Sequence, residues 1–222
     1  PSLSSKHVDA SSEAFSRTLD WAIRMVLLIG LPAALALILL AEPLLVSLFH
    51  YGAMTDHDVV MAARSLRAYA LGLLAFMLIK VLAPGYFARQ DTKTPVKIGI
   101  VAMFANMAMN LALIVPLAHA GLALATALSA FLNAGLLGLG LRRRGVLRFQ
   151  PGWGRYAVQV VGGCLVMGAG LWWFSPDWHT WVAWGALHRA GVLAALVVGG
   201  AALYFGWLAL SGVRLRDFRL QG

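Results

Sequence analysis

The sequence predicts an all-α, polytopic membrane protein: a helical bundle with six transmembrane helices. Hydrophobic residues make up 60% of the chain and charged residues 12%, with a mean hydropathy of +0.77. A soluble domain has about a quarter of its residues charged. The apolar residues also fall into blocks of about 20, the length that an α-helix needs to cross about 30 Å of hydrocarbon. No alternating β pattern competes, and lipid excludes open sheet edges.

The first two predicted spans enclose a short mixed segment. Residues 19–40 form the first span, which contains Pro32. Residues 42–58 combine polar and apolar side chains and have room for a short interfacial helix. The second span, residues 59–88, is long enough to tilt or to extend past the bilayer.

The third and fourth predicted spans form a hairpin. Residues 96–117 follow Thr94 and Pro95, which are expected to serve as the N-cap and the first helical residue. A tight turn at His119 and Ala120 leads directly into the fourth span, residues 121–141.

The last two spans cover residues 156–174 and 187–210. The whole chain then divides into a connecting segment (1–18), four spans (19–144) and a final pair with a basic tail (145–222). The first residue is not Met and the opening residues are polar, so we expect a piece of a longer protein. Tryptophans around the loop between the last two spans predict an aromatic belt at a membrane interface: Trp172, Trp173, Trp178, Trp181 and Trp184.

Most cationic side chains fall on one side of these spans. Fourteen of the 18 Lys and Arg residues lie at the start of the first span, around the loops after the second and fourth, or in the tail. Cytoplasmic loops are enriched in Lys and Arg, so both termini and these loops are expected in the cytoplasm. The cations there meet anionic lipid, and the net charge of +9 predicts no nucleic-acid partner. The fourteen are Lys6, Arg17, Arg24, Arg89, Lys93, Lys97, Arg142, Arg143, Arg144, Arg148, Arg155, Arg214, Arg216 and Arg219.

Several stretches are more specific than membrane composition alone. They are IKVLAPGYFARQDTKTPVKI at 79–98, LDWAIR at 19–24, HAGLALAT at 119–126, QPGW at 150–153 and PSLS at 1–4. In these stretches the chain resembles the MurJ (MviN) family of lipid II flippases, and the similarity covers essentially its whole length. Family members have fourteen helices, and these six resemble helices nine to fourteen.

The resemblance implies transport without covalent chemistry. The cargo would be a peptidoglycan precursor linked to undecaprenyl pyrophosphate, moved across the bacterial cytoplasmic membrane by alternating access. The fold would be that of the MOP-superfamily exporters, with residues 19–144 completing the second of two lobes. Its partners would be the precursor, membrane lipids and the N-terminal half of the same protein, without which this chain should not transport.

Two other interpretations stay open. The chain could belong to another exporter of the superfamily, a drug/cation antiporter or an O-antigen flippase, or to a non-transporting membrane scaffold. No cofactor is expected, but coupling to a monovalent cation or to the membrane potential is open. The histidines are scattered and no catalytic motif is present, so neither a metal site nor an enzyme is predicted.

Two cations are candidates for contact with the substrate's pyrophosphate. Lys80 lies inside the second span, where a cation costs roughly 2.5 to 3.5 kcal/mol on insertion scales. It should therefore face a cavity, with Arg89 nearby, or else extend its amine to the cytoplasmic interface. Pro84 and Gly85 could form a hinge or a static kink. The turn with Asp91, Lys93, Thr94 and Pro95 could fix topology or contact a headgroup.

Polar and small residues mark two further candidates. Asn106 and Asn110 share one helix face, where Thr126 or Asn133 could meet them in an interhelical hydrogen bond or a monovalent cation site. The amides weaken the charge compensation that a cation site needs. Glycines of the last two spans permit either close helix packing or, as the resemblance implies, an apolar groove for the lipid tail: Gly162, Gly163, Gly199 and Gly200.

Overall fold

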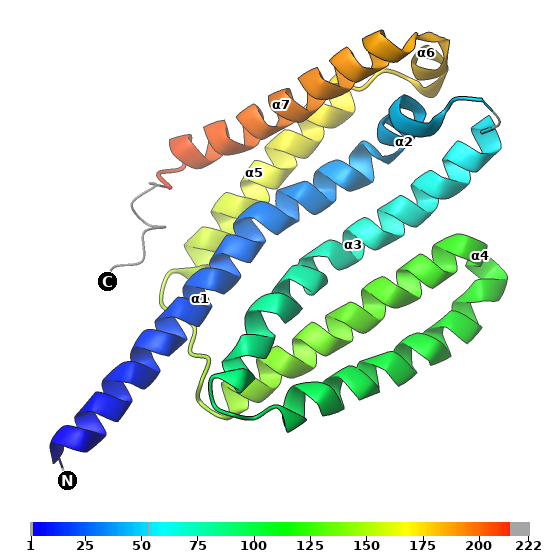
Figure 1. The fold of residues 1–222 in the computed structure, drawn as a ribbon. Helices are drawn as coiled ribbons and strands as arrows, with labels where there is room; N and C mark the ends of the chain where they lie inside the picture. The colour runs from blue at the N-terminus through cyan, green and yellow to red at the C-terminus, as the bar shows by residue number, and fades with distance from the viewer. Residues whose placement is uncertain (1, 53, 214–222) are drawn as a thin grey trace.

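The computed structural model describes residues 2–52 and 54–213, with side chains from Glu13 onward, and every regular element in this part is a helix. This confirms the predicted all-α class. In chain order the helices are α1 (Ser2–Leu39), α2 (Ala41–Phe49), α3 (Asp56–Phe87), α4 (Lys93–Arg143), α5 (Trp153–Phe174), α6 (Trp178–Ala183) and α7 (Ala186–Leu210) (Figure 1).

The helix α4 is a hairpin. Its 51 residues would extend about 77 Å if straight, but Ala118 has φ 48° and ψ −128°, and the chain reverses there (Figure 1). Gly121 allows the two arms to meet, since a Cβ at this position would lie 2.3 Å from the carbonyl oxygen of Leu113. The reversal falls one residue before the predicted turn at His119 and Ala120.

Six membrane crossings follow from this geometry. Within the described residues, five helices are long and apolar enough to span a membrane, and α4 supplies two crossings. The prediction of six transmembrane helices is therefore confirmed. The short helix expected within 42–58 is α2, and α3 begins with a capping box in which Thr55 and Asp58 exchange hydrogen bonds.

The predicted connecting segment is helical. The helix α1 begins at Ser2 and continues without interruption into the first span. Its polar composition concealed this continuation, because polar residues such as Ser, Glu and Lys are compatible with a helix as well as with a loop.

Two hydrophobic cores share α1. One lies among α1, α2, the start of α3, α5, α6 and α7 and includes Leu28, Val46 and Tyr204. The other lies among α1, α3 and the second arm of α4 and includes Ile23 and Leu137. Figure 1 shows α1 running between the α3–α4 unit and the α5–α7 pair, so α1 connects the two halves of the bundle.

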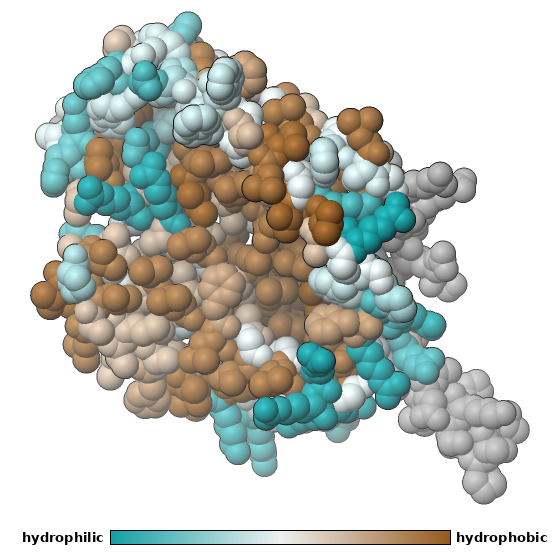
Figure 2. Space-filling view, turned by 180° about the vertical axis from the view of Figure 1, so that it is seen from behind, coloured by the Kyte–Doolittle hydropathy of each residue, from teal (hydrophilic) through white to brown (hydrophobic). Residues whose placement is uncertain are grey.

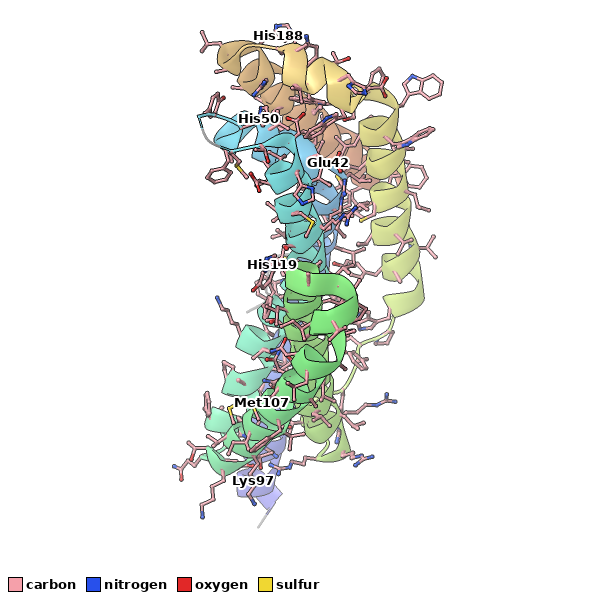
Figure 3. All side chains as sticks on the ribbon, turned by 90° about the vertical axis from the view of Figure 1, so that its right-hand side faces the viewer. Glu42, His50, Lys97, Met107, His119 and His188 are labelled. Carbon is pink, nitrogen blue, oxygen red and sulfur yellow. The ribbon has the colours of Figure 1, made fainter. Side chains whose placement is uncertain are left out.

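The outer surface suits lipid. Figure 2 shows hydrophobic residues gathered over the middle of one face, with hydrophilic residues toward the ends. Val115 is 87% exposed, and large apolar side chains are exposed along α4, α5 and α7. The helix ends fall into two groups. We call the end that carries the α3–α4 and α4–α5 loops the basic end, and the end that carries α2 and α6 the opposite end. Lys97 lies near the first and His188 near the second (Figure 3).

Candidate functional site

Asp91 joins both ends of the α4 hairpin. Its carboxylate accepts hydrogen bonds from the Thr94 backbone N–H at 3.0 Å and the Thr94 hydroxyl at 2.6 Å, and it also pairs with Arg144. Arg144 donates a further bond to the Thr94 hydroxyl oxygen at 3.0 Å. The Thr94 hydroxyl and then Arg144 hold the pKa of Asp91 well below its usual range, and Asp91 in turn raises the pKa of Arg144.

This arrangement corrects the predicted cap. The helix α4 begins at Lys93, one residue before Thr94, and Thr92 at the N-cap position makes no side-chain capping bond. Asp91 accepts the N–H of Thr94 instead, because its carboxylate can satisfy α4 and Arg144 together. Lys93 is exposed, and Pro95 lies in the first turn of α4, where its missing N–H leaves no bond unmade.

A second anchor at the basic end involves Asp20, which sequence reasoning missed. This residue is only 2% exposed. Its carboxylate accepts from Trp153 Nε1 at 2.7 Å, from the Gln150 backbone N–H at 3.2 Å and from Arg24 Nε at 2.9 Å. A single acidic residue at the start of an apolar span, four positions before an arginine, was the available signal.

The predicted cavity residues lie on an uncovered stretch of α3 and just beyond its end. Lys80 is exposed, and within the described part of the chain the side chains of Lys80 and Arg89 make no hydrogen bond or ion pair. Lys80, Pro84 and Phe87 recur at helical spacing and are all exposed. Gly85 is buried against Leu141, whose Cδ1 would lie 3.0 Å from an added Cβ. The structure thus turns Lys80 and Pro84 outward and uses Gly85 in helix packing.

Asn106, Asn110 and Thr126 come together between the two arms of α4. Asn106 Nδ2 lies 3.5 Å from Thr126 Oγ1 and 3.3 Å from Ser129 Oγ, and Asn110 Nδ2 donates to Asn106 Oδ1 at 3.0 Å. Asn110 Oδ1 is buried without a hydrogen-bond partner. Ser129 was not predicted, whereas Asn133 makes no hydrogen bond to this cluster in the described structure. The cluster gathers neutral oxygen atoms without a carboxylate.

The four candidate glycines of the final pair separate into two environments. An added Cβ at Gly162 or Gly163 would lie 2.9 Å from Trp207 or Tyr204, so these two permit close packing of α5 on α7. Gly199 has open space around its Cα. A Cβ on Gly200 would lie 3.1 Å from Leu171 Cδ2, so Gly200 is packed, and both glycines line an apolar cavity of about 610 Å³ between α5 and α7.

Arg189 is the main polar feature of the opposite end. Although 6% exposed, it donates to the carbonyl oxygens of Trp181 at 2.9 Å, Val182 at 2.7 Å and Val46 at 3.2 Å. It thereby ties α2 and α6 to α7. The predicted aromatic belt needs one correction, because Trp181 is buried at 2% exposure while Trp172 and Trp173 face outward.

In the part of the chain that the structure describes, no three His, Cys, Asp or Glu residues are placed to share a metal ion.

Known proteins share both the sequence and this fold. A sequence model of the family described as lipid II flippase MurJ matches residues 1–190. The chain is 47% identical over 219 residues to a probable lipid II flippase MurJ of Vibrio cholerae, which covers 99% of this chain and 42% of that protein. It is 45% identical over 221 residues to a lipid II flippase MurJ of Burkholderia cenocepacia, covering 99% of this chain and 43% of that protein.

A solved structure described as lipid II flippase MurJ in an inward closed conformation has the same fold. Its TM-score is 0.69 at 20% identity, over 88% of this chain and 40% of that one. The chain thus spans about two fifths of the length of the curated relatives it matches. With the family model matching most of its residues, this multi-pass membrane chain belongs to the MurJ family of lipid II flippases.

Proposed function

We propose that this chain is the C-terminal part of a transporter that moves a lipid-linked peptidoglycan precursor across the bacterial cytoplasmic membrane by alternating access. The observation that carries this proposal is the match of nearly the whole chain to proteins named as lipid II flippases. The six crossings and the shared fold support it. The N-terminal part of the protein would supply the other lobe of the cavity.

We place the basic end in the cytoplasm, because the loops there carry most of the Lys and Arg residues. Two variants of the full-length protein, each with one accessible cysteine, test this orientation: Arg143→Cys and His119→Cys. A maleimide that cannot cross the membrane should label the His119 position from the periplasmic side and the Arg143 position only after the inner membrane is opened. The reverse pattern would overturn the orientation.

The exposed face of α3 is the proposed contact surface for the pyrophosphate. Lys80 precedes the end of α3 by seven residues, about 10 Å along the helix. Its cost in lipid is offset if it faces a water-filled cavity completed by the rest of the protein. Arg89 lies beyond the end of α3 and would attract the same anionic group near the cytoplasmic interface.

The Lys80 role is tested by growth rescue in cells depleted of the native flippase. In the full-length protein, Lys80→Ala should impair rescue and Lys80→Arg should restore most of it, at equal protein levels. Full rescue by Lys80→Ala would remove this residue from the substrate path. Failure of the wild-type full-length protein to transport the precursor would favour another exporter or a scaffold.

The remaining site residues take roles that follow from their surroundings. We propose that Pro84 allows α3 to bend during the transport cycle, and that the apolar cavity at Gly199 and Gly200 receives part of the prenyl tail. The oxygen cluster at Asn106, Asn110 and Thr126 would be an interhelical contact, or a site for a monovalent cation that couples transport. Sodium-dependent protection of the full-length protein against heat, lost in Asn110→Ala, would support the cation role. If sodium protected the wild type and Asn110→Ala equally, the cluster would be an interhelical contact and not a cation site.

A further inference from the structure

We propose that a pocket at the basic end, between α1, α5 and the end of α7, binds the phosphate headgroup of an anionic membrane phospholipid. The pocket has a volume of about 230 Å³. Arg24 and Arg155 line it with Trp21, Gln159 and Gly212. This charged pocket shares no lining residue with the α3 face or with the cavity at Gly199.

The first cation, Arg24, is held rigidly at the pocket wall. Its Nε pairs with Asp20, and its Nη2 donates to the carbonyl oxygens of Gln150 and Pro151 at 3.2 Å each. The guanidinium also lies over the rings of Trp153 and Tyr156, 5.0 and 5.5 Å from their centroids. Arg24 Nη1 makes no hydrogen bond within the described residues, so a fixed donor is left for a ligand.

The second cation, Arg155, is uncompensated. It is exposed, and its side chain makes no ion pair or hydrogen bond in the part of the chain that the structure describes. Its Nη2 lies 3.5 Å from where a Cβ on Gly212 would be, which places the guanidinium at the end of α7. Both oxygens of Asp20 already accept hydrogen bonds. The pocket is therefore lined by two guanidinium groups, and the nearby Asp20 carboxylate is already satisfied, which favours a phosphate as the ligand.

An apolar pocket continues along the same seam of helices. It has a volume of about 200 Å³ and is lined by Leu28, Ile29 and Pro32 of α1 together with residues of α5 and α7. One of these, Gly200, also borders the cavity proposed for the prenyl tail. Leu28 and Ile29 follow Met25, a wall of the charged pocket, by about one helical turn. A ligand with a charged head and a hydrocarbon chain would fill both pockets, whereas inorganic phosphate would use the first alone.

The sizes favour a membrane phospholipid over the proposed precursor. Pockets for drug-sized ligands are about 300 to 1,000 Å³, and the charged pocket lies below this range. It can enclose a phosphodiester and its glycerol, whereas a disaccharide with a peptide would extend out of it. Arg24 also lies near the start of the first span, at the depth where cationic side chains meet lipid headgroups.

The test measures retained phospholipid on the purified full-length protein by native mass spectrometry, after addition of phosphatidylglycerol or phosphatidylcholine. The wild-type protein should retain phosphatidylglycerol in preference. Arg155→Gln should lower its affinity for this lipid by about five- to tenfold, as expected for loss of a charge-assisted contact. Arg143→Gln removes an equal charge from the same end, outside the pocket, and should have little effect. An equal loss of affinity for phosphatidylglycerol in both variants, or no loss in either, would overturn the assignment of this site.

Three further measurements identify the molecule that carries the phosphate. Ala201→Trp fills the apolar pocket and should weaken retention of the long-chain lipid, while inorganic phosphate at millimolar concentration should displace little of it. Unchanged retention in Ala201→Trp together with full displacement by phosphate would indicate a free-phosphate site and contradict the lipid assignment. Competitive displacement by added lipid II that is lost in Arg155→Gln would assign the pocket to the substrate and also contradict it.

Discussion

Trp153 Nε1 donates a hydrogen bond to Asp20 Oδ1 at 2.7 Å, across 133 residues of sequence. The contact fastens the start of α5 to the first span. Nearby, the Arg148 backbone N–H donates to Ser16 Oγ at 2.9 Å. The loop between α4 and α5 is therefore fixed to α1, and the final helix pair is held in a set position beside the other four crossings.

Removing the Asp20 carboxylate should destabilise the protein strongly. Asp20→Ala leaves Arg24 without its anion and the Trp153 and Gln150 donors without an acceptor. We expect a loss of about 3 to 5 kcal/mol, the range for breaking a buried charged contact. Trp153→Phe removes one donor only and should cost roughly 0.5 to 1.5 kcal/mol. Thermal unfolding of the full-length protein in detergent measures both, and equal stability of Asp20→Ala and the wild type would refute the anchor.

The α4 hairpin should not tolerate a side chain at Gly121. An added Cβ would lie 2.3 Å from the Leu113 carbonyl oxygen, which belongs to backbone and cannot rotate away. Gly121→Ala should therefore cost about 1 to 3 kcal/mol or more through overpacking. Gly135→Ala on the same helix meets nothing within 4 Å and serves as the control. Monodisperse yield on size exclusion compares them, and indistinguishable yields would contradict this packing.

The Asp91 contact should be independent of pH under physiological conditions. Its pKa in the folded protein lies below the unfolded value because the Thr94 hydroxyl and Arg144 donate to the ionised form. The stabilisation is present above the unfolded pKa, about 3.9, and is lost only as the pH falls through the lower folded value. Asp91→Asn should thus lower the melting temperature by the same small amount at about pH 6 and pH 8. If the difference in melting temperature between Asp91→Asn and the wild type vanished at about pH 6, the lowered pKa of Asp91 would be contradicted.

Two glycines of the final pair should respond in opposite ways to a large side chain. Gly199→Phe occupies open space in the apolar cavity and should leave folding intact while reducing growth rescue severalfold. Gly163→Phe collides with Tyr204 and should reduce the amount of folded protein. Fluorescence-detected size exclusion separates folding from function. Full rescue by well-folded Gly199→Phe would exclude this cavity from the path of the lipid tail.

The sequence was informative where one local property decides the structure. Apolar blocks of membrane-spanning length located all six crossings, and the residues around His119 located the reversal of α4 to within one position. Contacts distant in sequence were not predictable in this way. Arg189 lies at the start of the last predicted span, and no local pattern indicates that it binds the Val46 carbonyl oxygen 143 residues away. Likewise, only the packing of α5 against α7 shows that Tyr204 occupies the space beside Gly163, whereas the space beside Gly199 is open.

The central claim is most directly tested by the appearance of lipid II on the periplasmic leaflet. Cells depleted of the full-length protein can be exposed to an external enzyme that cleaves lipid II, and the cleaved fraction can be measured. We predict that depletion sharply lowers this fraction and that the wild-type gene restores it. An unchanged fraction in depleted cells would contradict the account.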